Sequence, residues 1–171
     1  MLTIVEAETP EQIGTARELI VEYATWLGFN LCFQGFEEEM RTLPGKYARP
    51  DGRLLLALWD GRPAGVIALR PLQDDAQPGL CEMKRLFVRP EFRGHEIGRR
   101  LAERVIVEAT EIGYTRMRLD TIGGKMGKAI AMYRELGFVE TVPYYDTPVN
   151  ETLFMELALS SGTGANERAA G

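Results

Sequence analysis

Residues 84–101 read KRLFVRPEFRGHEIGRRL, in which an apolar strand runs into a glycine-containing turn and the turn opens directly into a helix. The first backbone N–H groups of a helix have no partner within the helix, and the helix dipole adds partial positive charge there. Both effects favour a phosphate group, and Arg93 and Arg99 would add full positive charges. A helix start without any ligand would have the same local pattern, so the turn alone predicts an anion site without identifying the anion.

Apolar residues on both sides of this stretch recur at the periods of strands and helices. Thr9 and Gln12 predict a capping box ahead of a helix, Asp60-Gly61 predicts a hairpin, and a one-residue slip of the apolar phase within residues 80–88 predicts a β-bulge. The expected strands are 2–7, 53–59, 63–69, 80–88, 115–121, 138–142 and 153–159, and the expected helices are 10–28, 36–43, 97–112 and 129–136. This order predicts one α/β domain with a mixed sheet over residues 1–159, followed by a disordered tail at 160–171.

The composition restricts the class of function. The chain has 171 residues and a formal net charge of -5, which argues against a general nucleic-acid binder with a basic face. No apolar run approaches the roughly 18 residues needed to span a bilayer, and the first residues lack the basic flank of a signal peptide. Cys32 and Cys81 form neither a disulfide framework nor a metal cluster, and His95 is the only histidine. We therefore expect a cytoplasmic protein with no bound metal, no membrane partner and no nucleic-acid partner.

Two motifs resemble those of the GNAT superfamily of N-acetyltransferases. The first is Phe87-Val88-Arg89-Pro90 followed by Arg93-Gly94-x-x-Ile97-Gly98 and Leu101, which looks like that family's acetyl-CoA signature. The second is AMYRELGF at residues 131–138, in which Tyr133 is followed four residues later by Gly137-Phe138. The order of expected elements over about residues 2–159 also fits. The resemblance implies a mostly antiparallel sheet flanked by helices, and direct transfer of an acetyl group from acetyl-CoA to an amine.

The resemblance also implies a cofactor site along the first motif, with a catalytic acid and base nearby. The expected acetyl-CoA contacts are Leu86, Phe87, Val88, Arg93, Gly94, His95, Glu96, Ile97, Gly98 and Arg99. Tyr133 is expected to protonate the departing thiolate, although its place on an apolar stripe also fits a core residue. Glu82 is the preferred base and Asp120 the alternative, while either carboxylate could instead be structural. A backbone N–H freed by the bulge would hold the thioester carbonyl oxygen.

Glu96 departs from the family pattern, because a glycine usually stands at this position. A side chain here could crowd the pyrophosphate, and its carboxylate would repel it. We favour the alternative in which Glu96 faces solvent and acts as an ordinary acid in the first turn of the helix.

Recognition of the acceptor is expected from segments outside the two motifs. The candidate residues are Tyr23, Trp26, Phe33 and Tyr145, with Phe29, Gln34, Tyr144 and Asp146 beside them. Aromatic rings with a carboxylate suit a small cationic amine, although the same rings could belong to the core or to a homodimer face. We expect a small-molecule amine as the acceptor. A non-catalytic acyl-CoA-binding module and an acetyltransferase of protein N-termini or lysines remain as alternatives.

Overall fold

The computed structural model describes residues 1–28, 35–74, 76–124 and 126–160. Its strands are β1 (Leu2–Glu6), β2 (Arg53–Trp59), β3 (Arg62–Pro71), β4 (Leu80–Val88), β5 (Arg116–Ile122), β6 (Val139–Glu140) and β7 (Thr152–Ala158). They form one sheet in the order β1-β2-β3-β4-β5-β7-β6. Among these neighbours β4 and β5 run parallel and the others antiparallel, so the predicted mixed and mostly antiparallel sheet is confirmed.

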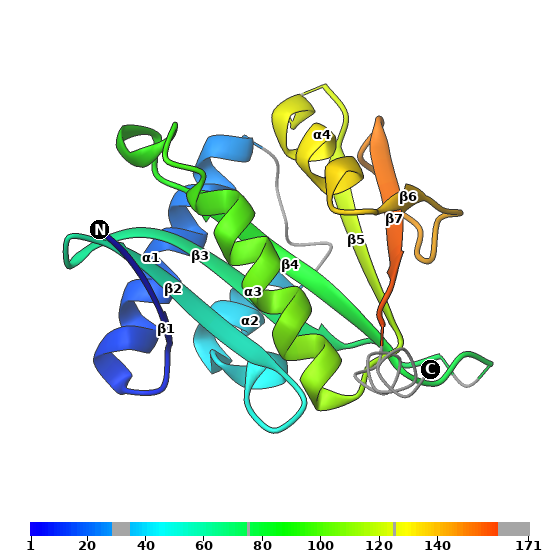
Figure 1. The fold of residues 1–171 in the computed structure, drawn as a ribbon, viewed down its shortest axis with the longest axis horizontal. Coiled ribbons are helices and arrows are strands. Elements are labelled where there is room, and N and C mark those ends of the chain that lie inside the picture. The colour runs from blue at the N-terminus through cyan, green and yellow to red at the C-terminus, as the bar shows by residue number, and fades with distance from the viewer. Residues whose placement is uncertain (29–34, 75, 125, 161–171) are drawn as a thin grey trace, which may run out of the picture.

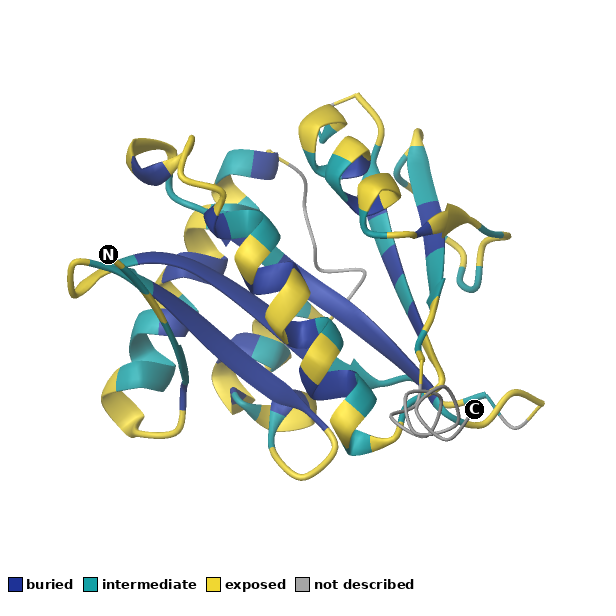
Figure 2. Cartoon of the chain, in the orientation of Figure 1, coloured by how far each residue is buried: buried dark blue, intermediate teal, exposed yellow. Residues whose placement is uncertain are grey.

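Helices cover both faces of the sheet, as Figure 1 shows. They are α1 (Pro10–Leu27), α2 (Phe36–Thr42), α3 (Ile97–Ile112) and α4 (Gly127–Glu135), with short 3-10 turns η2 (Gly45–Tyr47) and η3 (Pro90–Phe92). One buried cluster joins α3 and α4 to the sheet, and a second joins α1 and α2 to the opposite face. Figure 2 shows the result, with buried residues along the central strands and exposed residues on the outer helix surfaces. None of the helices in the described ranges could cross a membrane.

Local signals placed most elements correctly. The Thr9 hydroxyl accepts a hydrogen bond from the Gln12 N–H at 3.1 Å, and the Gln12 side chain accepts one from the Thr9 N–H at 3.1 Å, which is the predicted capping box. The strand predicted at 138–142 is shorter, because only Val139 and Glu140 pair with β7. Residues 161–171 of the predicted tail lie outside the described residues.

The predicted β-bulge lies in the second half of β4. Lys84 pairs with Ala68 of β3 and Phe87 pairs with Val66, so two residues of β4 oppose one residue of β3. Arg85 takes the left-handed conformation, with φ 62. The extra residue interrupts the ladder and redirects the strand at this point.

The parallel pair β4 and β5 is joined only at its beginning. The registered partners are Leu80–Glu82 on β4 and Arg116–Arg118 on β5, although both strands continue for several residues beyond them. Figure 1 shows the two strands moving apart from this shared end, with α4 and β7 staying beside β5. The divergence opens the sheet next to the bulge and creates room for a binding pocket.

Candidate active site

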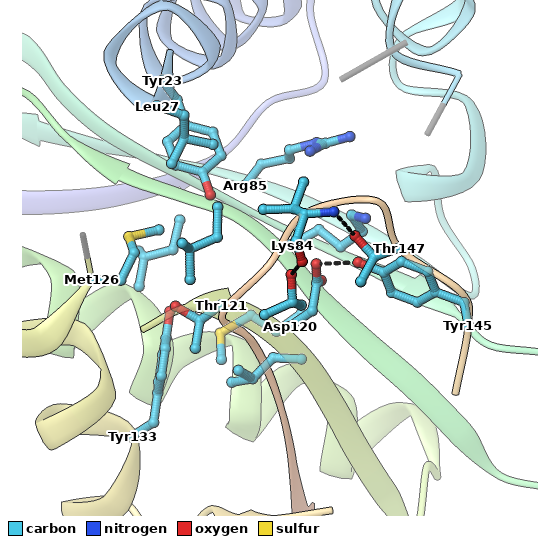
Figure 3. Close-up of a pocket in the computed structure, with 16 residues that line it drawn as sticks. Tyr23, Leu27, Lys84, Arg85, Asp120, Thr121, Met126, Tyr133, Tyr145 and Thr147 are labelled. Atoms are coloured by element: carbon cyan, nitrogen blue, oxygen red, sulfur yellow. Dashed lines mark hydrogen bonds between the residues drawn. The ribbon is translucent and has the colours of Figure 1, made fainter. Parts of the chain in front are cut away.

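A pocket lies where β4 and β5 diverge, with about 670 Å³ of empty space including the part open to solvent. Its walls come from five parts of the chain that are distant in sequence (Figure 3). The residues that line it include Lys84 and Leu86 on β4, Asp120 and Thr121 on β5, Tyr23 on α1, Tyr133 on α4, and Tyr145 between β6 and β7.

Tyr133 extends from α4 into this pocket, and its ring is 5% exposed. It packs edge-on against Phe138, with 5.7 Å between the ring centroids. Figure 3 shows its hydroxyl on the pocket side, facing the region of Tyr23 and Thr121. Burial raises the pKa of Tyr133, and the nearby Tyr23 and Asp120 raise it further. The phenol therefore keeps its proton at neutral pH and can act as a hydrogen-bond donor.

The two candidate bases lie in different surroundings. The Tyr145 hydroxyl donates a hydrogen bond of 2.6 Å to Asp120 Oδ2, and Asp120 lines the pocket. Glu82 is 1% exposed, forms an ion pair of 2.7 Å with Arg70, and accepts a hydrogen bond of 2.7 Å from the Tyr144 hydroxyl. Glu82 does not line the pocket. Asp120, the weaker sequence candidate, is thus the carboxylate with access to a ligand.

Thr121 is a pocket residue that the sequence analysis did not single out. Its side chain is 3% exposed, and its hydroxyl has no hydrogen-bond partner within the described part of the chain. A buried hydroxyl without a partner is unfavourable, so such a group often marks the place of a ligand. Strand alternation places Thr121 on the inward face with Leu119, but no sequence signal reports an unsatisfied hydroxyl.

The turn before α3 has two residues with left-handed backbone conformation. Gly94 has φ 94 and Glu96, the residue that precedes the helix, has φ 58. Glu96 is exposed, and its side chain makes no capping hydrogen bond. Within the described residues, the backbone N–H groups from His95 to Arg99 donate no hydrogen bond. The predicted set of free donors is present, and the glycine-like backbone at Glu96 explains why the family has glycine there.

The arginines of the motif are less available than predicted. Arg93 Nε donates a hydrogen bond of 3.1 Å to the Val88 carbonyl, and its guanidinium lies over the Trp26 ring, 5.3 Å from the centroid. Arg99 forms an ion pair with Glu135 at the end of α4. Both arginines already have partners, whereas the backbone N–H groups of the turn have none among the described residues, so backbone donors dominate the anion site.

The other predicted residues lie around the site rather than together in it. The exposed His95 ring stacks on Trp59 with 4.3 Å between centroids. Tyr23 and Tyr145 line the pocket, whereas Trp26 packs on Phe87 outside it. Phe33, like Phe29, Cys32 and Gln34, lies outside the described residues.

Metal and thiol chemistry find no support in the part of the chain that the structure describes. No cluster of three or more potential metal ligands occurs there. Burial raises the pKa of Cys81 to about 12, so this thiol is protonated at neutral pH and is a poor nucleophile.

Comparisons with known proteins agree with this geometry. The model of the Acetyltransferase (GNAT) family matches residues 17–138. An uncharacterized N-acetyltransferase of Schizosaccharomyces pombe is 34% identical over 160 residues, which cover 93% of this chain and 96% of the relative. A GNAT-family acetyltransferase of Staphylococcus aureus Mu50 shares the fold with a TM-score of 0.75 at 20% identity, covering 94% of this chain and 100% of that chain.

A Salmonella typhimurium acetyltransferase, solved with its cofactor acetyl-CoA, shares the fold with a TM-score of 0.65 at 19% identity, over 93% of this chain and 94% of that chain. The alternative of a non-catalytic binding module therefore loses its support, since the relatives are N-acetyltransferases. The chain belongs to the GNAT family of acetyltransferases, and it is an acyltransferase.

Proposed function

We propose that this protein transfers an acetyl group from acetyl-CoA directly to a primary amine of a small molecule. The observation that carries the proposal is the pocket between the diverging strands β4 and β5, where the carboxylate of Asp120 and the hydroxyl of Tyr133 face the same space. A proton acceptor and a proton donor on one pocket are what direct acyl transfer to an amine requires.

The free backbone donors before α3 support a pyrophosphate site. The N–H groups from His95 to Arg99 are without partners among the described residues, and they stand at the positive end of the helix dipole. Gly94 leaves open space where a side chain would otherwise project. We assign the diphosphate of coenzyme A to this turn, with Arg93, Arg99 and the exposed Arg100 close enough in sequence to add charge.

The bulge and the pocket support the position of the reacting group. Arg85 and Leu86 oppose the single residue Ile67, so their backbone lies outside the regular ladder. We propose that an N–H group of this bulge donates a hydrogen bond to the carbonyl oxygen of the thioester. Acetyl-CoA supplies that thioester, whose carbon–sulfur bond breaks as the carbon–nitrogen bond of the product forms.

Asp120 and Tyr133 divide the proton transfers between them. An alkyl amine has a pKa near ~10 and is mostly protonated at neutral pH, so its lone pair must first be freed. We propose that Asp120 takes this proton, directly or through water, and that Tyr133 donates its proton to the departing sulfur. Thr121 lies beside Tyr133 with an unsatisfied hydroxyl, and we assign it a hydrogen bond to the same end of the ligand.

A small acceptor fits the pocket better than a protein chain. The segment between β6 and β7 covers the acceptor side, where Tyr144 and Tyr145 bond to Glu82 and Asp120 on the two diverging strands. An extended peptide would need an open cleft at this place. The covering segment therefore favours a compact amine over a protein N-terminus or lysine.

Release of free thiol from acetyl-CoA, measured over a panel of small amines, tests the function. Calorimetry with acetyl-CoA runs in parallel, on the wild type and on Tyr133→Phe and Asp120→Asn. We expect binding in all three proteins, with turnover strongly reduced in both variants. A wild type that binds acetyl-CoA but acetylates no small amine, while acetylating a peptide N-terminus or lysine, would contradict the proposal.

A further inference from the structure

The pocket contains charges of both signs on its two opposing strands. Asp120 of β5, which the sequence analysis gave as the alternative base, contributes a carboxylate. Lys84 of β4 lines the same pocket, and its side chain is 8% exposed. Figure 3 shows Lys84 and Asp120 as neighbours on the acceptor side, with Tyr145 beside them. The pocket is therefore not simply an anionic site.

A second cation on the pocket wall, Arg85, forms an ion pair with Glu39. Arg85 Nε and Nη2 donate hydrogen bonds of 2.9 and 3.0 Å to the two carboxylate oxygens of Glu39. Because Glu39 lies on α2, this bidentate pair directs the charge of Arg85 toward α2 and away from the pocket. Lys84 and Asp120 line the pocket from its two opposing strands, so a bound acceptor would meet a cation on one side and a carboxylate on the other.

An acceptor with one ammonium group and no anion would satisfy Asp120 but would be repelled by the ammonium of Lys84. A zwitterion matches both, since each of its charges meets the opposite sign. Resting on the acyl transfer proposed above, we propose that the acceptor is an amino acid or a similarly small amine with a carboxylate, bound with its carboxylate toward Lys84 and its amine toward Asp120.

The environment of Lys84 agrees with this arrangement. Burial lowers the pKa of Lys84, although Glu82 and Asp120 act in the opposite direction, so its ammonium is less stable than in water. A bound carboxylate would add a third anion and stabilise the ammonium. Leu27, Ile122 and Met126 make part of the wall apolar, and this part suits an uncharged side chain.

The wild-type protein tests this directly. Thiol release is measured for the proteinogenic amino acids in L and D forms, each beside its amide and its decarboxylated amine. For the preferred acceptor we expect kcat/KM for the acid to exceed that for both matched compounds by about tenfold or more, the scale of one charge-assisted hydrogen bond. Equal or better turnover of the amide or the decarboxylated amine would overturn the inference.

Lys84→Met identifies the residue responsible, because it keeps an unbranched side chain and removes the charge. The preference for the acid over the amine should fall to near unity, while kcat/KM for the decarboxylated amine is kept or increased. Lys84→Gln provides a polar second variant should the first fail to fold, and the exposed Lys46→Met is the matched control, expected to keep the full preference. An unchanged preference in a folded Lys84 variant would also overturn the inference.

The acceptor class and the acyl transfer can be refuted separately. Turnover confined to amines without a carboxylate leaves the proposed function intact and removes only the acceptor class. Absence of thiol release over the entire panel would remove the proposed function and the acceptor class with it.

Discussion

Glu96 allows the structure of the cofactor turn to be tested in free-energy terms. Its left-handed backbone costs about 1 kcal/mol for a residue other than glycine, whereas its carboxylate at the start of α3 contributes about 0.5 kcal/mol through the helix dipole. Glu96→Gly removes both terms and should stabilise the fold by about 0.5 kcal/mol, and Glu96→Gln removes only the favourable one. The melting temperature should therefore rise by about 1–2 °C in the first variant and fall by about the same amount in the second.

The same two variants should bind acetyl-CoA more tightly than the wild type. A carboxylate about 7 Å from a diphosphate with about two negative charges is repelled by roughly 1 kcal/mol in water, and salt at 0.15 M reduces this to about 0.5 kcal/mol. Calorimetry should give a Kd lower by about two- to threefold at that salt concentration, with a larger difference at low salt. Glu103→Gln makes the same change in net charge about 10 Å further along α3, and it should leave the Kd unaltered.

The directions in which the Kd for acetyl-CoA and the melting temperature change could each contradict these expectations. If Glu96→Gly bound acetyl-CoA less tightly than the wild type, the carboxylate would be a ligand-supporting group rather than a tolerated departure from glycine. If Glu96→Gly melted below Glu96→Gln, the left-handed conformation would cost less than assumed. Either result would contradict the energies assigned to Glu96.

Substitutions at Tyr133, Thr121 and Asp120 test the chemistry of the pocket, and Glu82→Gln is compared with the last of them. Tyr133→Phe should lower kcat by about 10²-fold with an unchanged Kd for acetyl-CoA, because only the donated proton is lost; equal kcat would remove Tyr133 from the mechanism. Thr121→Val removes a buried unsatisfied hydroxyl, so it should raise the free energy of unfolding by about 1 kcal/mol. The same variant should lower kcat about tenfold, whereas Thr121→Ser should keep kcat. A Thr121→Val variant with full kcat would contradict the assigned contact. Asp120→Asn should lower kcat/KM by about 10²-fold at neutral pH, and this kcat/KM should recover as the pH approaches the pKa of the amine near ~10. Glu82→Gln should mainly destabilise the fold, by about 3 kcal/mol, because it leaves Arg70 without its ion-pair partner. Thermal melts and pH–rate profiles together distinguish Asp120→Asn from Glu82→Gln. A ratio of the Asp120→Asn kcat/KM to the wild-type kcat/KM that does not change with pH would count against the role of Asp120.

Signals carried by neighbouring residues were sufficient for most of the fold. The capping box of Thr9 and Gln12 is a contact over three residues, and the phase slip in β4 is visible as soon as the apolar pattern is counted. Such features depend on backbone sterics and on side-chain periods, which the local sequence already contains. The elements and the turn before α3 were predictable for this reason.

The choice between Glu82 and Asp120 depended on information of another kind. Alternation alone gives no reason to prefer either, since both carboxylates lie on strands beside the presumed site. The structure separates them because β4 and β5 stay paired as far as Glu82 and Arg118 and diverge beyond. Glu82 therefore lies in the closed part of the sheet with Arg70, while Asp120 lies in the open part. The point where two strands part is a property of the packed sheet, and no local pattern reports it.

The motif arginines show why a family signature can be right about a ligand and less accurate about its contacts. Arg93 is engaged with Val88 and Trp26, and Arg99 with Glu135, so their charges stabilise the turn and its link to α4. The donors that remain available are backbone N–H groups, whose directions follow from φ at Gly94 and Glu96. A backbone site tolerates a change of side chain as long as the conformation is kept. Glu96 can therefore replace glycine at a cost of about 1 kcal/mol, because its exposed side chain leaves those N–H groups where they are.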